Sequence, residues 1–305
     1  MQVIKIGTRE SRLAVVQAEV VASYIHRFCE GKEPQLVKMK TTGDKILDRT
    51  LYKVGGKGLF VKELDRSLRE GSTDISVHSL KDVPMEVSRD LPLLGVSARE
   101  DARDVLVLPF GFTELNPALP LGTSSPRRMI QLGRLFPQME IKSVRGNVQT
   151  RLAKLDGGEY SGLVLAAAGL KRLGLEGRIS RYFTVEEMVP AAGQGMLAIQ
   201  GREGEDYRYL EGFFDEKAAC CARAERSFVR ALDGGCSSPI AAYAKITSAG
   251  NHMGVEDSGG EEVLNLTGLY AREGSREYRT ASVAGRKQEA QRLGEELARE
   301  IKNFA

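Results

Sequence analysis

The sequence of 305 residues has no tryptophan, only three histidines and four cysteines, and these shortages exclude several kinds of site. No two cysteines form a CxxC pair, so we predict neither a disulfide framework nor a bound metal. Aromatic residues make up 6% and the net charge is +3, which disfavours a broad nucleic-acid-binding surface. Nucleic acid stays open as an alternative partner.

Long apolar runs are missing as well. The first residues, MQVIKIGTRE, alternate like a strand and unlike a signal peptide, and no stretch reaches the length of a membrane span. We therefore expect a cytoplasmic protein that binds no membrane. With 42% hydrophobic and 28% charged residues the composition is that of a globular protein, and the length predicts two or three domains.

Strands alternate with helices through the first two thirds of the chain, which predicts α/β domains. Thr8 and Ser11 can cap the first helix. The apolar positions of this helix at helical spacing are Leu13, Val16, Val20, Val21, Tyr24 and Phe28. Residues 188–203 indicate an extended crossing with Gly193 and Gly195 as hinge-like positions, and a strand at residues 196–200 that leads back to the first domain.

The last third has a different pattern. A helix is followed by strands near residues 240–246, 263–269 and 277–281 and by a final helix over about 284–303. An antiparallel sheet packed against helices is typical of a separate small α+β domain.

Basic residues recur where predicted strands end and helices begin. Arg127 and Arg128 follow Ser125 and Pro126 in the first turn of a helix, where cations are disfavoured by about 0.3–1 kcal/mol, so the pair suggests a compensating anionic ligand. Two further strand-to-helix junctions carry cations. The basic residues at such positions are Arg9, Lys53, Lys57, Lys81, Arg127, Arg128, Arg145, Arg151 and Arg172.

A single residue of this set would be read as a solvated surface charge. Nine at the ligand-binding ends of elements predict a cleft for a substrate with several acid groups, because arginine binds carboxylates bidentately. Asp82 follows a strand end among them, together with Ser79 and Lys81. It is either a turn aspartate or a group that bonds a nitrogen-bearing substrate and stabilises a cation.

Cys236 lies in the turn DGGCSSP between the predicted helix and strand of the last third. It is either a small buried cysteine or a thiol that reaches into a cleft.

Nine stretches, taken together and in this order, closely resemble the porphobilinogen deaminase family, also called hydroxymethylbilane synthases. They are IGTRESRLAVVQAE, KTTGDKILD, GGKGLFVKELD, DISVHSLKDVP, GTSSPRR, RGNVQTRL, AAAGLKRLG, PAAGQGMLAIQ and ERSFVRALDGGCSSP. The poorest match lies beyond Thr247, and Arg12 departs from the proline common in the family.

The resemblance implies a fold of two periplasmic-binding-protein-like α/β domains with a cleft between them and a small α+β C-terminal domain. Residues 1–98 and 198–216 would form the first domain, residues 99–197 the second, and residues 217–305 the third. It also implies a transferase of tetrapyrrole biosynthesis, which condenses four porphobilinogen molecules into hydroxymethylbilane and releases four ammonia. The implied cofactor is a dipyrromethane primer joined to Cys236 as a thioether.

The resemblance further implies a role for each matching residue. Asp82 would be catalytic, stabilising the azafulvene cation that forms as ammonia departs. The cofactor would be held by Ser79, Lys81, Asp82, Ser125, Arg127, Arg128, Arg145, Gly146 and Cys236. Substrate would be bound by Arg9, Ser11, Lys53, Lys57, Phe60, Arg145, Arg151, Arg172 and Gln194. We expect a monomer with porphobilinogen as its partner and no nucleic acid or membrane.

Two other functions stay open from the residues alone. A non-catalytic anion-binding module predicts no covalent group on Cys236, and a nucleic-acid-binding protein predicts affinity that falls steeply with salt. The position of Cys236 after a helix disfavours the thiolate, which suits a bond formed once better than repeated turnover. The expected chemistry therefore lies with Asp82 and the arginines.

Overall fold

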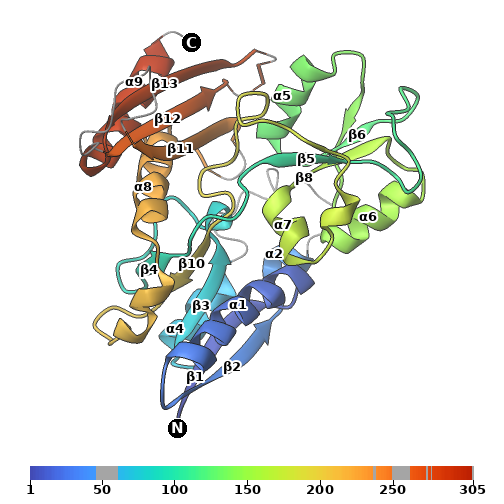
Figure 1. Cartoon of the computed structure of the whole chain (residues 1–305). Helices are drawn as coiled ribbons and strands as arrows, with labels where there is room; N and C mark the ends of the chain where they lie inside the picture. Colours follow the sequence, from blue (N-terminus) through green and yellow to red (C-terminus); the bar gives the residue numbers. More distant parts are fainter. Residues whose placement is uncertain (46–60, 236–237, 249–261, 273, 276, 304–305) are drawn as a thin grey trace.

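The computed structural model describes the chain except residues 46–60, 236–237, 249–261, 273, 276 and 304–305. Its described strands form two sheets of five strands and one of three (Figure 1). The first sheet contains the N-terminal strands in blue, the second is mostly green, and the third, in orange and red, lies next to the C-terminal helix.

The first sheet has the strand order β2-β1-β3-β10-β4. Strand β1 pairs in parallel with β2 and β3, whereas β10 pairs antiparallel with β3 and β4. The strands are β1 (Gln2–Arg9), β2 (Lys32–Met39), β3 (Ile75–Ser79), β4 (Leu93–Val96) and β10 (Leu197–Gln200). The accompanying helices are α1 (Arg12–Phe28), α2 (Thr42–Lys45), α4 (Lys62–Arg69), η1 (Leu80–Asp82) and η3 (Arg208–Phe213).

The second sheet repeats this pattern with the order β7-β6-β8-β5-β9. Strand β6 pairs in parallel with β7 and β8, and β5 pairs antiparallel with β8 and β9. The strands are β5 (Asp104–Val107), β6 (Leu121–Gly122), β7 (Ile141–Lys142), β8 (Gly162–Ala166) and β9 (Arg181–Tyr182). The helices are α5 (Pro126–Leu135), α6 (Val148–Asp156), α7 (Ala167–Arg172) and η2 (Glu176–Arg178).

Helix α1 is capped by Ser11 as expected, but its buried face differs from the predicted apolar stripe. Val20 and Phe28 are 43% and 62% exposed, so the prediction was wrong for these two residues. The buried residues are Ala14, Gln17, Ala18, Val21 and Ile25. Small alanines and one polar residue fill the face that packs on the sheet, and a pattern based on large apolar side chains does not detect them.

Two extended crossings join the sheets, one before β5 and one before β10. They run side by side, since the Glu100 N–H donates to the Gly195 carbonyl at 3.1 Å. Gly193 and Gly195 both have positive φ, and a Cβ on Gly195 would lie 2.3 Å from the Glu100 carbonyl oxygen. Glycine is therefore required at Gly195 for the crossings to approach each other.

The C-terminal unit packs a three-stranded antiparallel sheet against two helices. Its elements are α8 (Glu216–Ala231), β11 (Ile240–Ser248), β12 (Glu262–Tyr270), β13 (Arg279–Arg286), η5 (Lys287–Glu289) and α9 (Ala290–Asn303). The predicted third strand was too short and the final helix was predicted to begin too early, because β13 pairs with β12 as far as Arg286. Strand pairing at Ala284 outweighs the helix propensity of alanine.

Two α/β units with equivalent strand order and a C-terminal α+β unit confirm the predicted fold class. The exact domain boundaries stay a prediction.

Glu225 of α8 joins the C-terminal unit to both crossings. Its fully buried carboxylate accepts a bond from Arg99 Nη2 at 2.6 Å. It also accepts the backbone N–H groups of Gly193 and Ala244, each at 2.7 Å. One charge therefore ties α8, β11 and the two crossings together.

Replacing Glu225 with glutamine should destabilise the protein by about 3–5 kcal/mol, since the change leaves Arg99 buried without its counter-charge. Urea unfolding monitored by circular dichroism measures the effect. Glu296→Gln is the control, because Glu296 pairs with Arg292 on the exposed face of α9. Equal unfolding free energies for the two variants would contradict the assigned role of Glu225.

Candidate active site

One cavity of about 660 Å³ brings together every predicted site residue that the structure describes. This volume is within the range of roughly 300–1,000 Å³ found for small-ligand sites. The predicted residues that line the cavity are Arg9, Ser11, Ser79, Lys81, Asp82, Ser125, Arg127, Arg128, Arg145, Gly146, Arg151, Arg172 and Gln194. Cys236, Lys53, Lys57 and Phe60 lie outside the described residues, although Gly235 and Ser238 on either side of Cys236 line the cavity.

The topology explains why these residues meet. Strand β1 ends at Arg9, and β3 ends at Ser79, where the turn η1 carries Lys81 and Asp82. In the second sheet β6 leads into Ser125 at the start of α5. Parallel strands direct their carboxyl ends to one edge, so both sheets contribute their ligand-binding edge to the same cavity.

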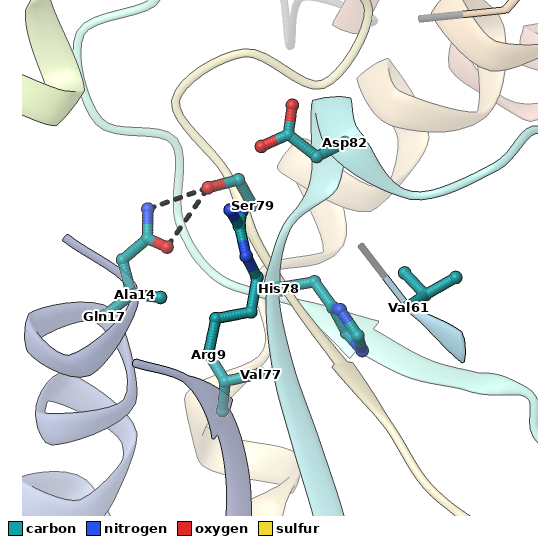
Figure 2. A pocket seen from close by; sticks show the side chains of 8 residues that line it. All are labelled: Arg9, Ala14, Gln17, Val61, Val77, His78, Ser79 and Asp82. Carbon is teal, nitrogen blue, oxygen red and sulfur yellow. Dashed lines mark hydrogen bonds between the residues drawn. The ribbon is translucent and has the colours of Figure 1, made fainter. Parts of the chain in front are cut away.

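Gln17 of α1 lies beside Asp82 and was not predicted from the sequence. Its side-chain amide is paired with the Ser79 hydroxyl: Gln17 Nε2 donates to Ser79 Oγ at 2.8 Å, and Oγ donates back to Oε1 at 3.1 Å (Figure 2). Arg9 and Asp82 line the same recess. The only signal in the sequence is a polar residue among the alanines of the buried face of α1.

Figure 2 also shows His78 pointing away from Asp82. The His78 ring nitrogen Nε2 lies 3.1 Å from Gln200 Oε1, and burial lowers the pKa of His78 to about 4. His78 is therefore neutral at neutral pH and is held by Gln200, although it lines the same recess as Asp82.

Lys81 is buried next to Asp82. Burial lowers the pKa of Lys81 to about 8, although the charge of Asp82 acts in the opposite direction. Its Nζ donates to Gln194 Oε1 at 3.3 Å. The charge of Lys81 is therefore sensitive to pH in the neutral-to-basic range.

Arg127 and Arg128 lie in the first turn of α5, as predicted, but the protein itself supplies an anion beside them. The carboxylate of Asp104 accepts bonds from both arginines at 2.7 Å. The sequence suggested an anionic ligand for this pair, and the structure shows that Asp104, from a different element, β5, already supplies one negative charge against the two cations. Ser125 occupies the N-cap position, but within the described chain its side chain makes no capping hydrogen bond.

The second half of the cavity carries further arginines. Arg151 Nε donates to the Gly146 carbonyl at 2.8 Å. Burial, followed by the positive charges of Arg128 and Arg145, lowers the pKa of Arg151 to about 10. Three arginines this close give this part of the cavity a positive potential, which favours a ligand with several acid groups.

The strand-to-helix junction that carries Lys171 and Arg172 differs from the prediction. Lys171 and Arg172 lie in the last turn of α7, where cations suit the helix dipole, and not in the first. Lys171 pairs with Glu100, and Arg172 Nη2 donates to the Gly195 carbonyl at 2.6 Å. Arg172 thus lines the cavity and contacts the crossing at the same time.

A two-lobed α/β protein with a cation-lined cavity and a carboxylate among the cations is a binding protein or enzyme for a small polyanion. Family models match residues 4–209, as "porphobilinogen deaminase, dipyromethane cofactor binding domain", and residues 219–303, as "porphobilinogen deaminase, C-terminal domain".

Porphobilinogen deaminase of Ruminiclostridium cellulolyticum is 50% identical over 99% of both chains. That of Acetivibrio thermocellus is 50% identical over 98% of this chain and 97% of its own. The chain belongs to the porphobilinogen deaminase family, as its nine motifs predicted. Among solved structures, the methionine binding protein MetQ shares 14% identity and a TM-score of 0.44 over 72% of this chain and 90% of its own.

The affinity for an acidic substrate should fall as pH rises through about 8, because Lys81 then loses its charge. Bound acid groups raise this pKa, so the loss begins at or above that pH. KM measured between pH 7 and 10 should rise by at most about tenfold per pH unit.

Lys81→Arg is the matched variant, since arginine stays charged over this range. The ratio of the two KM profiles isolates the lysine from any titration of the substrate. A ratio that does not change with pH would exclude any contribution of the Lys81 charge to the affinity for substrate.

Proposed function

We propose that the chain condenses four molecules of porphobilinogen head to tail, releases four ammonia and, with water, hydrolyses the resulting tetrapyrrole from a dipyrromethane primer as hydroxymethylbilane. Membership of the family over nearly the whole chain supports this function. The observation that carries it is the single cavity in which Asp82 lies among cations from both α/β units.

We also propose the domain limits 1–98 with 198–216, 99–197 and 217–305, and a cytoplasmic monomer without a nucleic-acid or membrane partner. Among the described helices, none has the length and apolar character needed to cross a membrane.

Porphobilinogen carries an acetate and a propionate, so each added unit brings two carboxylates into the cavity. The proposed substrate residues are Arg9, Ser11, Arg145, Arg151 and Arg172, with Lys53, Lys57 and Phe60 from outside the described residues. Gln194 is fully buried and accepts a bond from Lys81, so its proposed role is to hold that lysine. Bidentate pairing with arginine would fix the direction of each acid group.

The residues present suit a dipyrromethane, which also carries acid groups. Arg128 is 6% exposed, and its Nε has no hydrogen-bond partner among the described residues, so this buried donor is available to a carboxylate. The proposed cofactor residues are Ser79, Lys81, Asp82, Ser125, Arg127, Arg128, Arg145 and Gly146, with Cys236 as the attachment point. When bound, the dipyrromethane supplies the pyrrole carbon to which the first substrate is joined.

Asp82 is the proposed catalytic residue. It follows a buried strand on a short 3-10 turn, so its backbone is fixed by β3. When ammonia leaves porphobilinogen, positive charge develops on the pyrrole ring, and a carboxylate stabilises that charge and accepts the ring N–H. The neighbouring cations would hold the acid groups of the same molecule. The substrate would thus be fixed both at its acid groups and at the ring on which positive charge develops.

Asp82→Asn should lower kcat by about 10²–10⁴-fold, because asparagine keeps the size but removes the negative charge. Ammonia release from porphobilinogen measures turnover. Asp101→Asn is the control, since Asp101 pairs with Arg103 on the crossing and does not line the cavity described here. Near-normal kcat in Asp82→Asn would remove Asp82 from the mechanism.

Protein purified from cells that make porphobilinogen should carry a covalent dipyrromethane, which intact-protein mass spectrometry detects as added mass. Cys236→Ser should have the mass of the bare chain, because a hydroxyl is a far weaker nucleophile than a thiol toward an electrophilic carbon. A bare-chain mass for the unsubstituted protein would favour a non-catalytic anion-binding module.

A further inference from the structure

Asp104, the first residue of β5, lies behind the arginines of the cavity. Its side chain is fully buried, and it is not among the described residues that line the cavity. Oδ2 accepts a bond from Arg127 Nη1, and Oδ1 accepts one from Arg128 Nη2, each at 2.7 Å. One carboxylate therefore holds two neighbouring guanidinium groups.

Each guanidinium has a second fixed acceptor on the backbone. Arg127 Nη1 also donates to the Val189 carbonyl at 2.7 Å, and Arg128 Nη1 donates to the Val164 carbonyl at 3.0 Å. A planar group held by a carboxylate and a carbonyl cannot turn freely. The Arg128 Nε that has no partner among the described residues is thus presented in a fixed direction.

The same carboxylate extends the network toward Asp82. Gln194 Nε2 donates to Asp104 Oδ1 at 2.8 Å, and Gln194 Oε1 accepts from Lys81 Nζ at 3.3 Å. Lys81 precedes Asp82 in the chain. Asp104 therefore fixes the distance between the two arginines of α5 and Lys81, which lies next to the proposed catalytic carboxylate.

Asp104 stays ionised in this setting. Burial by itself would raise its pKa, but the charges of Arg127 and Arg128 and their hydrogen bonds hold the pKa well below its usual range. One anion against two cations leaves a net positive charge, so the network still attracts acid groups. A buried ion pair adds little to stability compared with apolar packing, so stability alone does not account for this cluster.

We propose that Asp104 is a positioning residue for the reaction, which acts by fixing Arg127 and Arg128 in the direction that receives the acid groups of the dipyrromethane. This inference rests on the proposed function. Asp104 touches neither substrate nor cofactor in this scheme. The competing role is a purely structural brace between β5 and α5.

Asp104→Asn distinguishes the two roles, because asparagine offers one carbonyl acceptor and would turn an N–H₂ donor toward one of the arginines. If Asp104 is a positioning residue, Asp104→Asn should lower kcat/KM of the holoenzyme by about 10–100-fold. A small misplacement of a binding group has an effect of this size. The fraction of purified chains that carry the dipyrromethane mass should fall as well.

Glu225→Gln is the matched control. It also removes a fully buried carboxylate paired with an arginine, Arg99, but neither residue is among the described cavity residues. Both variants lose stability in urea, whereas only Asp104→Asn should lose kcat/KM and cofactor content. If both variants keep the kcat/KM and cofactor content of the unsubstituted protein, Asp104 is a brace and the proposal is overturned.

A double-mutant cycle with Arg128→Gln tests the route of the effect. If Asp104 acts through Arg128 and its neighbour, the loss in kcat/KM from Asp104→Asn should be much smaller when Arg128 is already replaced. Fully additive losses would overturn the proposal.

Asp104→Glu covers the case in which the asparagine variant does not fold. It keeps the charge but moves the carboxylate by one methylene, so kcat/KM should still fall by about tenfold or more, and an unchanged value would overturn the proposal.

Failure of the proposed function has a separate signature. The unsubstituted protein and Asp101→Asn would then release no ammonia from porphobilinogen, and the positioning role would fail with it.

Discussion

The concentration of positive charge in one cavity is the constraint on which the rest of the structure depends. Guanidinium groups repel each other strongly where water does not screen them, as the lowered pKa of Arg151 reflects after the larger effect of burial. The buried carboxylate of Asp104 offsets part of this cost, because it pairs with both Arg127 and Arg128. The cations that Asp104 does not compensate attract a ligand with several acid groups.

The duplicated topology explains how the charges are brought together. Each α/β unit has three parallel strands, a crossing strand in the opposite direction and an edge strand, and each presents its carboxyl edge to the other. The crossings carry both the glycine that lets them approach and the carbonyl that receives Arg172. A change in the angle between the units would therefore alter the surroundings of a residue that lines the cavity, which links the geometry of the crossings to that of the site.

Local patterns in the sequence predicted those features that depend on neighbouring residues. The strand end before Asp82, the proline at the start of α5 and the glycines of the crossing are all local, and the structure has each of them. What could not be predicted depends on contacts between distant segments. Asp104 lies 23 residues before Arg127, Gln17 lies 62 residues before Ser79, and Glu225 lies 126 residues after Arg99. The start of α9 was predicted too early for the same reason, because pairing with β12 places Ala284 in a strand.

The positions of Asp104 and Asp82 explain why two carboxylates in one network can have different tasks. Asp104 accepts hydrogen bonds from two arginines and a glutamine, so its negative charge holds these neighbours in place. Asp82 lines the cavity, which suits its proposed role of stabilising a cation that forms during the reaction. Gln194 bonds both Asp104 and Lys81, the residue before Asp82, so the proposed positioning role of Asp104 extends to the proposed catalytic carboxylate.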